Sequence, residues 1–385
     1  MEMSCYAAIA QTEVVDAASA ALKVLEDCSC QLQGRTPSVA ILYASMDLDH
    51  VTILEAVLAV WPGIQLVGCT TDGEFSSKMG YTQDSIVLVL LGSATVTFDS
   101  GILETSAQGF SCSRKALDQA GIGTGGNPAL GLLFSDGLTF NAEAAILGFQ
   151  EAFGRHLPLC GAAAADGWQF TGTKQFHGNR VLSGSVVFLM ISGPVRFACA
   201  VRTGWHTVGR AGIVTRSCRN LVHEIDHKPA IEFFREFMGT AVIPSVETPI
   251  AVYDPDDRFQ FLRTTVSGTD PVTGAVTFFA SIAQNSRVRA TLVNRDSIVA
   301  GARDSVREAQ RLFGLDKPVI ALCWSCAARR IILGSRAVCE YQEVQQVLGS
   351  GVPVAGFYGF GEISPPGFDQ ATEFHNESFV TLLLG

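Results

Sequence analysis

The segment Gly351–Gly385, GVPVAGFYGFGEISPPGFDQATEFHNESFVTLLLG, contains a pattern that the chain repeats about three times. It has an apolar stretch ending at Gly356, an acidic turn at Gly361-Glu362, a Phe-His pair and an apolar run that begins at Ser378. Segments 64–92 and 158–193 carry most of these parts in the same order. Three ordered copies predict one supersecondary unit that is used repeatedly.

Each copy is preceded by an apolar stretch that begins with proline. These stretches are PSVAILYAS from Pro37, PALGLLFSD from Pro128 and PVIALCWSC from Pro318. A segment with helical spacing of apolar residues follows each one, at 49–61, 142–153 and 339–348. The repeated unit is therefore predicted to be strand–helix–strand–loop–strand. The strands are apolar on both faces, which is typical of sheets covered on both sides.

The chain changes character between the second and third copies. Segment 249–292 alternates apolar runs with turns and predicts a hairpin-rich sheet. Helices are predicted at 229–239, at 296–313, and from Thr12 to about Asp27. We expect a two-part α/β protein with mixed sheets built from the repeated units and a hairpin-rich insert. The parts are 1–225, which starts with the N-terminal helix, and 226–385.

Composition limits the classes of function. The 385 residues are 48% hydrophobic and 17% charged, with a net charge of −10, which argues against binding nucleic acid or anionic membranes. No apolar run reaches the roughly 18 residues of a membrane span, and the first residues do not resemble a signal peptide. The eleven irregularly spaced cysteines are then expected to be reduced thiols of a cytoplasmic protein.

Seven ordered segments resemble the FIST family (F-box and intracellular signal transduction). They are VGCTTDGEF (67–75), GAAAADG (161–167), GWHTVG (204–209), HEIDHKPA (223–230), SCAARR (325–330), GFYGFGEISPPG (356–367) and FHNES (374–378). The resemblance covers nearly the whole chain, with an N-terminal part at about 30–225 and a C-terminal part at about 226–366. It implies a sensory, small-ligand-binding module of signal transduction.

The resemblance also carries a more specific implication. One branch of the family, the bacterial NosP proteins, consists of stand-alone chains of about this length. That likeness implies bound haem b, nitric oxide as the signal and a histidine kinase as the partner. A cyclic-dinucleotide enzyme is the alternative partner. Apolar strand edges also make a homodimer compatible with the sequence.

Acidic residues near the repeated glycines are the first ligand-binding candidates. Glu74, Asp166 and Glu362 each follow an apolar strand, in or beside a glycine-rich loop. Open α/β sheets bind ligands at such carboxyl ends, where a carboxylate can hold a cation or an amine. Tyr358, in the same loop as Glu362, joins this set. The alternative is that the acids only cap turns.

The segment SCAARR supplies three more candidates. Cys326 ends a Cys-x-x-Cys motif, but no second such pair exists to complete a zinc site. Because AARRIILG is predicted to be a short strand, Arg329 and Arg330 would point to opposite faces. One would reach a ligand carboxylate or a haem propionate, and the other would be solvated or salt-bridged. A purely structural ion pair is the alternative.

Histidines are the candidates for an axial haem ligand. Haem iron is commonly held by a His, Cys, Met or Tyr side chain. His177 and His375 both follow Phe and are predicted to be equivalent in two copies. His177 is the first axial candidate, and His206, beside Trp205, is the second. The alternative for each is an ordinary hydrogen-bonded or solvent-facing histidine.

The sequence therefore predicts a sensor without enzymatic activity. Its ligand would be haem or a small metabolite such as an amino acid. The rival hypothesis is an enzyme that acts through Cys326 or through the three acids. Such a thiol enzyme requires a lowered pKa at Cys326. No Gly-x-Ser-x-Gly, Walker or His-Glu-x-x-His motif supports a familiar catalytic site.

Overall fold

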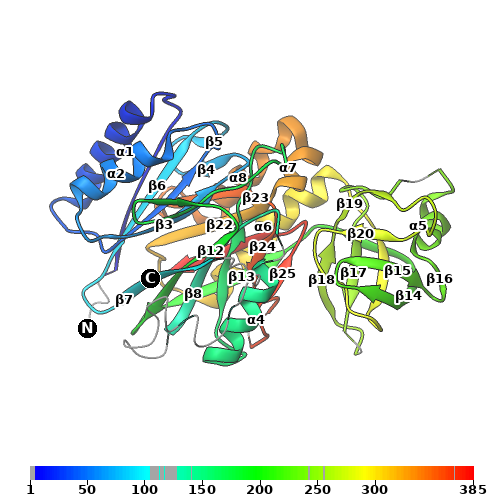
Figure 1. Ribbon diagram of the computed structural model, residues 1–385. Helices are drawn as coiled ribbons and strands as arrows, with labels where there is room; N and C mark the ends of the chain where they lie inside the picture. Colours follow the sequence, from blue (N-terminus) through cyan, green and yellow to red (C-terminus); the bar gives the residue numbers. More distant parts are fainter. Residues whose placement is uncertain are drawn as a thin grey trace.

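The computed structural model describes residues 5–104, 112, 117, 128–139, 141–241, 243–254, 256–367 and 369–385. Within these ranges the chain forms three six-stranded mixed sheets and one eight-stranded antiparallel sheet. Figure 1 shows the three mixed sheets gathered in one body, with the fourth sheet beside it. The predicted α/β class, with repeated units and a hairpin-rich insert, is confirmed.

Three consecutive units build the body. The first contains β1 (Tyr6–Thr12), α1 (Ala17–Leu32), β2 (Val39–Ala44), α2 (His50–Val60), β3 (Gln65–Thr70), β4 (Glu74–Ser76), β5 (Gly80–Thr82) and β6 (Ile86–Gly92). The second contains β7 (Thr97–Glu104), β8 (Pro128–Ser135), α4 (Asn141–Phe153), β9 (Leu159–Ala163), β10 (Gln175–His177), β11 (Arg180–Leu182) and β12 (Ser185–Ser192). The third contains β13 (Phe197–Arg202), α6 (Arg295–Phe313), β22 (Ile320–Cys326), α7 (Ala327–Leu333), α8 (Val338–Leu348), β23 (Val354–Gly359), β24 (Glu362–Ser364), β25 (Glu373–His375) and β26 (Phe379–Leu384).

The units exchange hairpins in a closed cycle. The first sheet has the order β1-β6-β2-β3-β10-β11, so a hairpin of the second unit completes it. In the same way, β24 and β25 of the third unit complete the second sheet, and β4 and β5 of the first unit complete the third. No unit can therefore form its complete sheet alone, and the body has approximate threefold symmetry.

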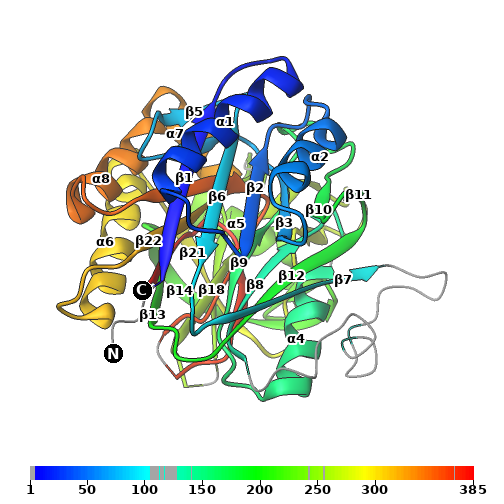
Figure 2. The same ribbon diagram turned by 90° about the vertical axis from the view of Figure 1, so that its left-hand side faces the viewer.

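The inner faces of the three sheets share one hydrophobic core. Tyr43, Phe134 and Trp324 occupy equivalent positions on β2, β8 and β22, and all three are fully buried in this core. Helices cover the outer faces: α1 and α2 the first sheet, α4 the second, and α6 and α8 the third. Figure 2 shows α1 and α2 lying over the first sheet. Burial on both faces explains why the strands are uniformly apolar.

The repeated glycine has a steric cause. Gly68 and Gly161 have φ angles of 155° and 143°, and a Cβ on either would lie about 2 Å from a carbonyl oxygen of the neighbouring strand. At Gly356 a Cβ would lie 2.3 Å from the carbonyl oxygen of Cys323. A side chain at these positions would force the parallel strands apart.

The insert follows β13 in the third unit. It contains β14 (His206–Cys218), β15 (Leu221–Ile225), β16 (Lys228–Pro229), α5 (Ala230–Met238), β17 (Ile250–Tyr253), β18 (Phe259–Arg263), β19 (Thr265–Thr269), β20 (Val276–Phe278) and β21 (Arg287–Leu292). The predicted boundary at 225/226 lies within this sheet, directly after β15. No helix in the described ranges is long and apolar enough to cross a membrane.

Two local predictions are wrong. Residues from Thr12 do not start a helix: β1 runs through Thr12, and Asp16 caps α1 by accepting from the backbone N–H of Ser19. The segment after Cys326 is the helix α7 rather than a strand. The first error concerns only the start of the helix, because Asp16 rather than Thr12 supplies the cap. The second segment has only seven residues, over which helical and extended periodicities are hard to distinguish.

Candidate functional site

A buried polar contact recurs in all three units. Glu74, Gln175 and Glu362 start equivalent strands, each lying opposite the residue that follows the repeated glycine. Each side chain accepts a hydrogen bond from the backbone N–H of the serine at the start of the closing strand, at 3.2–3.3 Å. The predicted equivalence of Asp166 with the two glutamates is therefore wrong, because Gln175 takes that place. The residue pairing, which sequence order alone did not reveal, decides this point.

Glu74 serves this repeated contact. It is fully buried and accepts from Ser85 Oγ at 2.5 Å and from the Thr71 hydroxyl. Burial raises the pKa of Glu74 to about 7. Because its oxygens are occupied by the first unit itself, Glu74 is part of the fold rather than of a ligand pocket.

Asp166 organises a loop after β9. Its carboxylate accepts from the backbone N–H groups of Gln169, Phe170, Thr171 and Gly172 at 2.7–3.1 Å. Phe170 adopts a φ of 54°, and Trp168, in the same loop, has a φ of 66°. Bulky residues rarely enter this region, and such strained residues cluster at ligand sites. The four hydrogen bonds to Asp166 hold the strained loop in place.

The strained loop forms one wall of an apolar pocket. The Phe170 ring stacks on Phe360 at a centroid distance of 5.0 Å, and Trp168 meets Phe360 edge-on at 5.8 Å. The cavity between its walls is nearly closed, with a volume of about 20 Å³. Its lining comes from the body and the insert: Trp168, Phe170, Val246, Thr264, Phe279, Cys326, Ala327, Ala328, Phe360 and Asn376. Ligand sites often occupy such junctions.

Two buried acids lie directly behind the pocket wall. Glu377 accepts from Thr264 Oγ1 at 2.9 Å, and Glu362 accepts from Ser378 Oγ at 2.7 Å. Glu377 Oε2 and Glu362 Oε1 have no hydrogen-bond partner within the described ranges. Burial raises the pKa of Glu377 to about 8 and that of Glu362 well above its ordinary value. Eight buried polar side-chain atoms of the described residues lack a partner, and these two are the only carboxyl oxygens among them. A buried carboxyl oxygen without a partner is costly, so these two require an explanation.

The thiol of Cys326 also faces this pocket. Cys326 is the last residue of β22 and the N-cap residue of the seven-residue helix α7. Burial raises the pKa of the Cys326 thiol well above its ordinary value, and the nearby Glu362 and Glu377 raise it further. The thiol is therefore protonated at neutral pH. This is opposite to the lowered pKa that the thiol-enzyme hypothesis requires.

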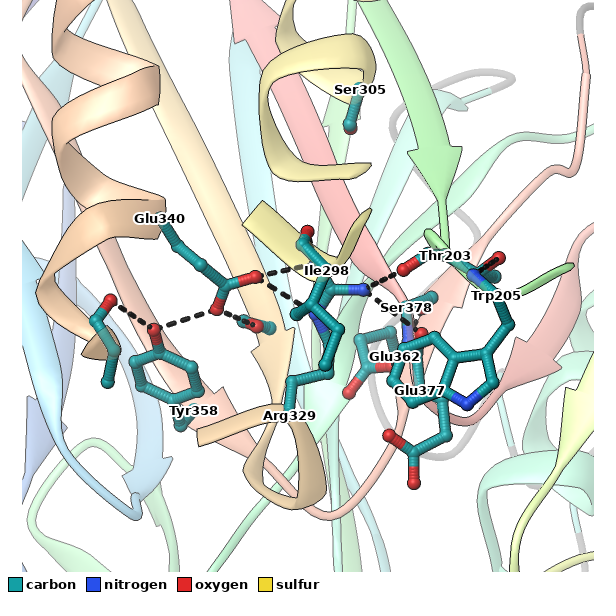
Figure 3. Close-up of polar contacts among 12 residues, drawn as sticks. Thr203, Trp205, Ile298, Ser305, Arg329, Glu340, Tyr358, Glu362, Glu377 and Ser378 are labelled. Carbon is teal, nitrogen blue, oxygen red and sulfur yellow. Dashed lines mark hydrogen bonds and ion pairs between the residues drawn. The ribbon is translucent and has the colours of Figure 1, made fainter. Parts of the chain in front are cut away.

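Arg329 belongs to a closed polar network next to the acids (Figure 3). Its guanidinium pairs with Glu340 at 2.5 Å and donates to the carbonyl oxygens of Thr203, Ile298 and Glu377. Arg329 and Glu340 are both completely buried. All the guanidinium nitrogens are thus committed to this protein's own acceptors, and Arg329 is not available for a ligand carboxylate.

Tyr358 and Arg330 are also committed. Tyr358 donates to Glu340 Oε2 at 2.8 Å. Arg330 binds Asp72 with two hydrogen bonds of 2.9 Å, which joins α7 to the loop after β3. Burial raises the pKa of Asp72 to about 6 despite the lowering effect of Arg330. Arg329 and Arg330 do point apart, but as neighbours on a helix, and both form structural ion pairs.

Neither predicted axial histidine lines the pocket. His177 is half-buried on β10 and contacts Ser100 Oγ at 3.0 Å, and His206 is exposed at the start of β14. His177 is equivalent to Ser364 on β24, so its predicted equivalence with His375 is wrong. Within the described ranges no group of three or more His, Cys, Asp or Glu side chains could hold a metal ion.

Haem therefore does not fit the pocket as described. A porphyrin needs an apolar slot with an axial ligand at iron. Unless its walls separate, the pocket of about 20 Å³ is far smaller than the roughly 300–1,000 Å³ of typical drug-sized ligand sites, and no described residue of its lining is a histidine. Among the described residues of the lining, the only sulfur ligand candidate is Cys326, whose raised pKa disfavours the thiolate.

The sequence reasoning missed most of the pocket. Trp168, Phe170, Phe360 and Glu377 all lie in or next to segments that carried the family resemblance, yet none was selected as a site residue. One usable signal was the pair of large aromatic residues directly after Asp166-Gly167, where a turn is expected to expose them. Glu377 carried no signal, because its burial depends on the insert.

The chain was compared with known proteins. A model of the FIST N domain matches residues 38–228, and a model of the FIST C domain matches residues 230–365. An uncharacterised protein of Mycobacterium bovis is 27% identical over 379 residues, covering 91% of this chain and 92% of that protein. An uncharacterised protein of Mycobacterium tuberculosis is 25% identical over 362 residues, covering 87% and 88%.

A cyanuric acid hydrolase of A. caulinodans aligns over 98% of this chain and 99% of its own, with 7% identity and a TM-score of 0.38. A likeness this weak supports no inference about fold or activity. The two domain models together span most of the chain, in the order that the resembling segments indicated. The chain therefore belongs to the FIST family, with a FIST N domain followed by a FIST C domain.

Proposed function

We propose that this protein is a sensor that binds a small ligand in the pocket between the body and the insert, without converting it. Membership of the FIST family implies a small-ligand sensor of signal transduction. The observation that carries the assignment to this pocket is the strained pair Trp168 and Phe170, held by Asp166 at an apolar cavity with unpaired buried carboxyl oxygens behind it.

The position of the pocket supports signal output through the insert. Thr264 and Phe279 come from the insert, whereas Trp168 and Phe360 come from the body. A ligand in the pocket would contact both parts at once. Binding would therefore favour the arrangement in which both walls fit the ligand, which is a population shift that a partner protein can recognise.

The neighbouring joint would transmit that shift. Arg263, adjacent to Thr264, is buried and donates to the carbonyl oxygens of Phe374 at 2.7 Å and Ser281 at 3.0 Å. It also pairs with Glu143 of α4. Arg263, which connects the insert to the body, is thus adjacent in sequence to the pocket residue Thr264. A ligand that contacts Thr264 would therefore act directly on this connection.

A ligand screen by thermal unfolding tests the proposal. The full chain is screened against a library of small metabolites, and hits are repeated with Phe170→Ala and with the control Phe259→Ala. Both phenylalanines are 41% exposed, but only Phe170 lines the pocket. We expect the hits to raise the melting temperature of the parent protein and the control but not of Phe170→Ala. Equal shifts in both variants would place the ligand elsewhere.

The more specific hypothesis is a haem-bound nitric oxide sensor that acts on a histidine kinase, or on a cyclic-dinucleotide enzyme. Its support is the resemblance to the NosP branch alone. Absorption spectra of protein from cells fed a haem precursor test it, before and after nitric oxide is added. A Soret band that shifts with the gas and is lost in His177→Ala or His206→Ala would favour haem over the pocket ligand.

A further inference from the structure

The polar surroundings of the pocket discriminate between classes of ligand, if the pocket is the sensor site proposed above. Among the described residues that line it, none is Lys, Arg or His. Two buried guanidinium groups lie next to the lining, and both are committed. Arg329 is paired with Glu340 and donates to carbonyl oxygens, and Arg263, adjacent to Thr264, pairs with Glu143 and donates to the carbonyl oxygens of Ser281 and Phe374. An anionic ligand would therefore be buried without a cation to balance it, which is costly.

The two acids behind the wall offer what a cationic group needs. Each has one buried carboxyl oxygen without a partner among the residues described, Glu362 Oε1 and Glu377 Oε2. Figure 3 shows both carboxyl groups on the side of Arg329 remote from Glu340. Neither acid lines the cavity itself, but Glu377 directly follows the pocket residue Asn376, and the next residue, Ser378, donates to Glu362. Thr264 links the Glu377 carboxyl directly to the pocket wall.

Comparison of the three units shows that the buried acid is particular to this site. The residue before the closing serine is Asp84, Gly184 or Glu377, and all three have φ between 54° and 62°. Glycine suits this conformation best, and Asp84 is exposed. Glu377 instead places a full-length acidic side chain in the interior, at 0% exposure. Such a costly choice of residue indicates that its carboxyl group is used.

The aromatic wall supplies the rest of the recognition. Trp168, Phe170 and Phe360 present ring faces and edges within about 6 Å of one another. Aromatic rings attract ammonium groups and stack on planar apolar bodies. We propose that the ligand is a small amine with an aromatic or compact apolar body, whose ammonium group is bound by Glu377 and Glu362. The ammonium group would take the place of the proton that Glu377 holds at neutral pH in the empty site.

Three probes of nearly equal size test the ligand class: benzylamine, benzyl alcohol and benzoate. Their dissociation constants are measured by calorimetric titration of the full chain. We expect binding in the order benzylamine, benzyl alcohol, benzoate. Glu377→Gln should weaken benzylamine about 10- to 100-fold, the loss expected for a charge-assisted hydrogen bond, with little change for benzyl alcohol. Glu362→Gln is the second variant, in case either acid alone suffices.

Glu55→Gln serves as the control, because it makes the same charge change on an exposed position of α2. Equal binding of all three probes, or a preference for benzoate, would overturn the amine assignment and leave the pocket intact as the sensor site. The same holds if benzylamine binding is unchanged in both glutamine variants. Failure of every probe to bind, together with metabolite hits that are insensitive to Phe170→Ala, would remove the proposed site itself.

Discussion

Replacing Glu340 with alanine is predicted to destabilise the body strongly. Glu340 and Arg329 are both 0% exposed, and they are joined by hydrogen bonds of 2.5 and 3.0 Å. Removing the carboxylate leaves a buried guanidinium without a counter-charge. It also removes the acceptor of the Ser325 and Tyr358 hydroxyl groups, which lie at 2.9 and 2.8 Å.

The expected magnitude follows from these contacts. Removing one partner of a buried ion pair costs about 3–5 kcal/mol. The three carbonyl oxygens that still accept from Arg329 keep the loss within this range rather than above it. Glu340→Gln should cost less, about 1–3 kcal/mol, because the amide oxygen can still accept from Arg329. The double variant Arg329→Met/Glu340→Met should be less destabilised than Glu340→Ala, since no charge is left buried.

Urea unfolding followed by circular dichroism measures these differences. The control is Glu232→Ala, which breaks the exposed pair of Arg235 and Glu232 on α5 at 2.8 Å. Exposed pairs contribute about 0–1 kcal/mol, so this variant should stay close to the parent protein. If Glu340→Ala lost no more stability than Glu232→Ala, the reasoning that treats the buried network as an electrostatic unit would be refuted.

Three further outcomes are expected. The pKa of Glu377 rises from 4.5 to about 8 on folding, so the folded state holds this proton over a pH range in which the unfolded state loses it. Glu377 therefore makes stability fall as pH rises from about 4.5 to 8. The melting temperature of Glu377→Gln should fall less over the same range. Ser378→Ala should lower the free energy of unfolding by about 1–3 kcal/mol, because the Ser378 hydroxyl donates to Glu362 at 2.7 Å. Ser185→Ala should lower it less, because the Ser185 hydroxyl donates to a nearby carbonyl oxygen. Urea unfolding compares the two variants, and equal losses would contradict this assignment. Iodoacetamide followed by mass spectrometry at pH 7.5 should label the buried Cys326 far more slowly than the exposed Cys30, and fast labelling of Cys326 would revive the thiol-enzyme hypothesis.

The repeated architecture could be predicted from sequence because its causes are local. The glycine at 68, 161 and 356 is required by close strand contact, and the apolar strands are required by burial on both faces. Both requirements produce residues that recur at similar spacing in the sequence. The pairing of strands from different units produces no such sequence pattern. Sequence order alone therefore places Asp166 with Glu74 and Glu362, whereas the strand register assigns that position to Gln175.

The pocket was harder to predict because its parts come from distant segments. The loops predict Cys326, Asp166 and Glu362 as site residues. Cys326 lines the pocket, Asp166 holds the loop of Phe170, and Glu362 lies behind the pocket wall. Thr264 and Phe279 reach it only because the insert folds back onto the body, which periodicity cannot reveal. The sequence predicts that Arg329 or Arg330 binds a ligand, but both form ion pairs within the protein, with Glu340 and Asp72 respectively.

Comparison of the three units separates residues of the fold from residues of the site. Contacts that recur, such as the serine that donates to Glu74 or Glu362, hold sheets together and should affect stability when changed. Cys326 and Glu377, which are confined to the third unit, take no part in these recurring contacts. The last position of the proline-led stretch is Ser45 in the first unit, Asp136 in the second and Cys326 in the third. Of the residues before the closing serine, only Glu377 is a buried acid.

The insert is also confined to the third unit, between β13 and α6. A threefold body would by itself offer three similar junctions, each closed by its own loops. The insert covers one of them, supplies Thr264 and buries Glu377 beneath it. The departure from symmetry therefore creates a single enclosed site with its own polar character. Substitutions at these unrepeated positions should change ligand binding more than stability, opposite to those at the repeated ones.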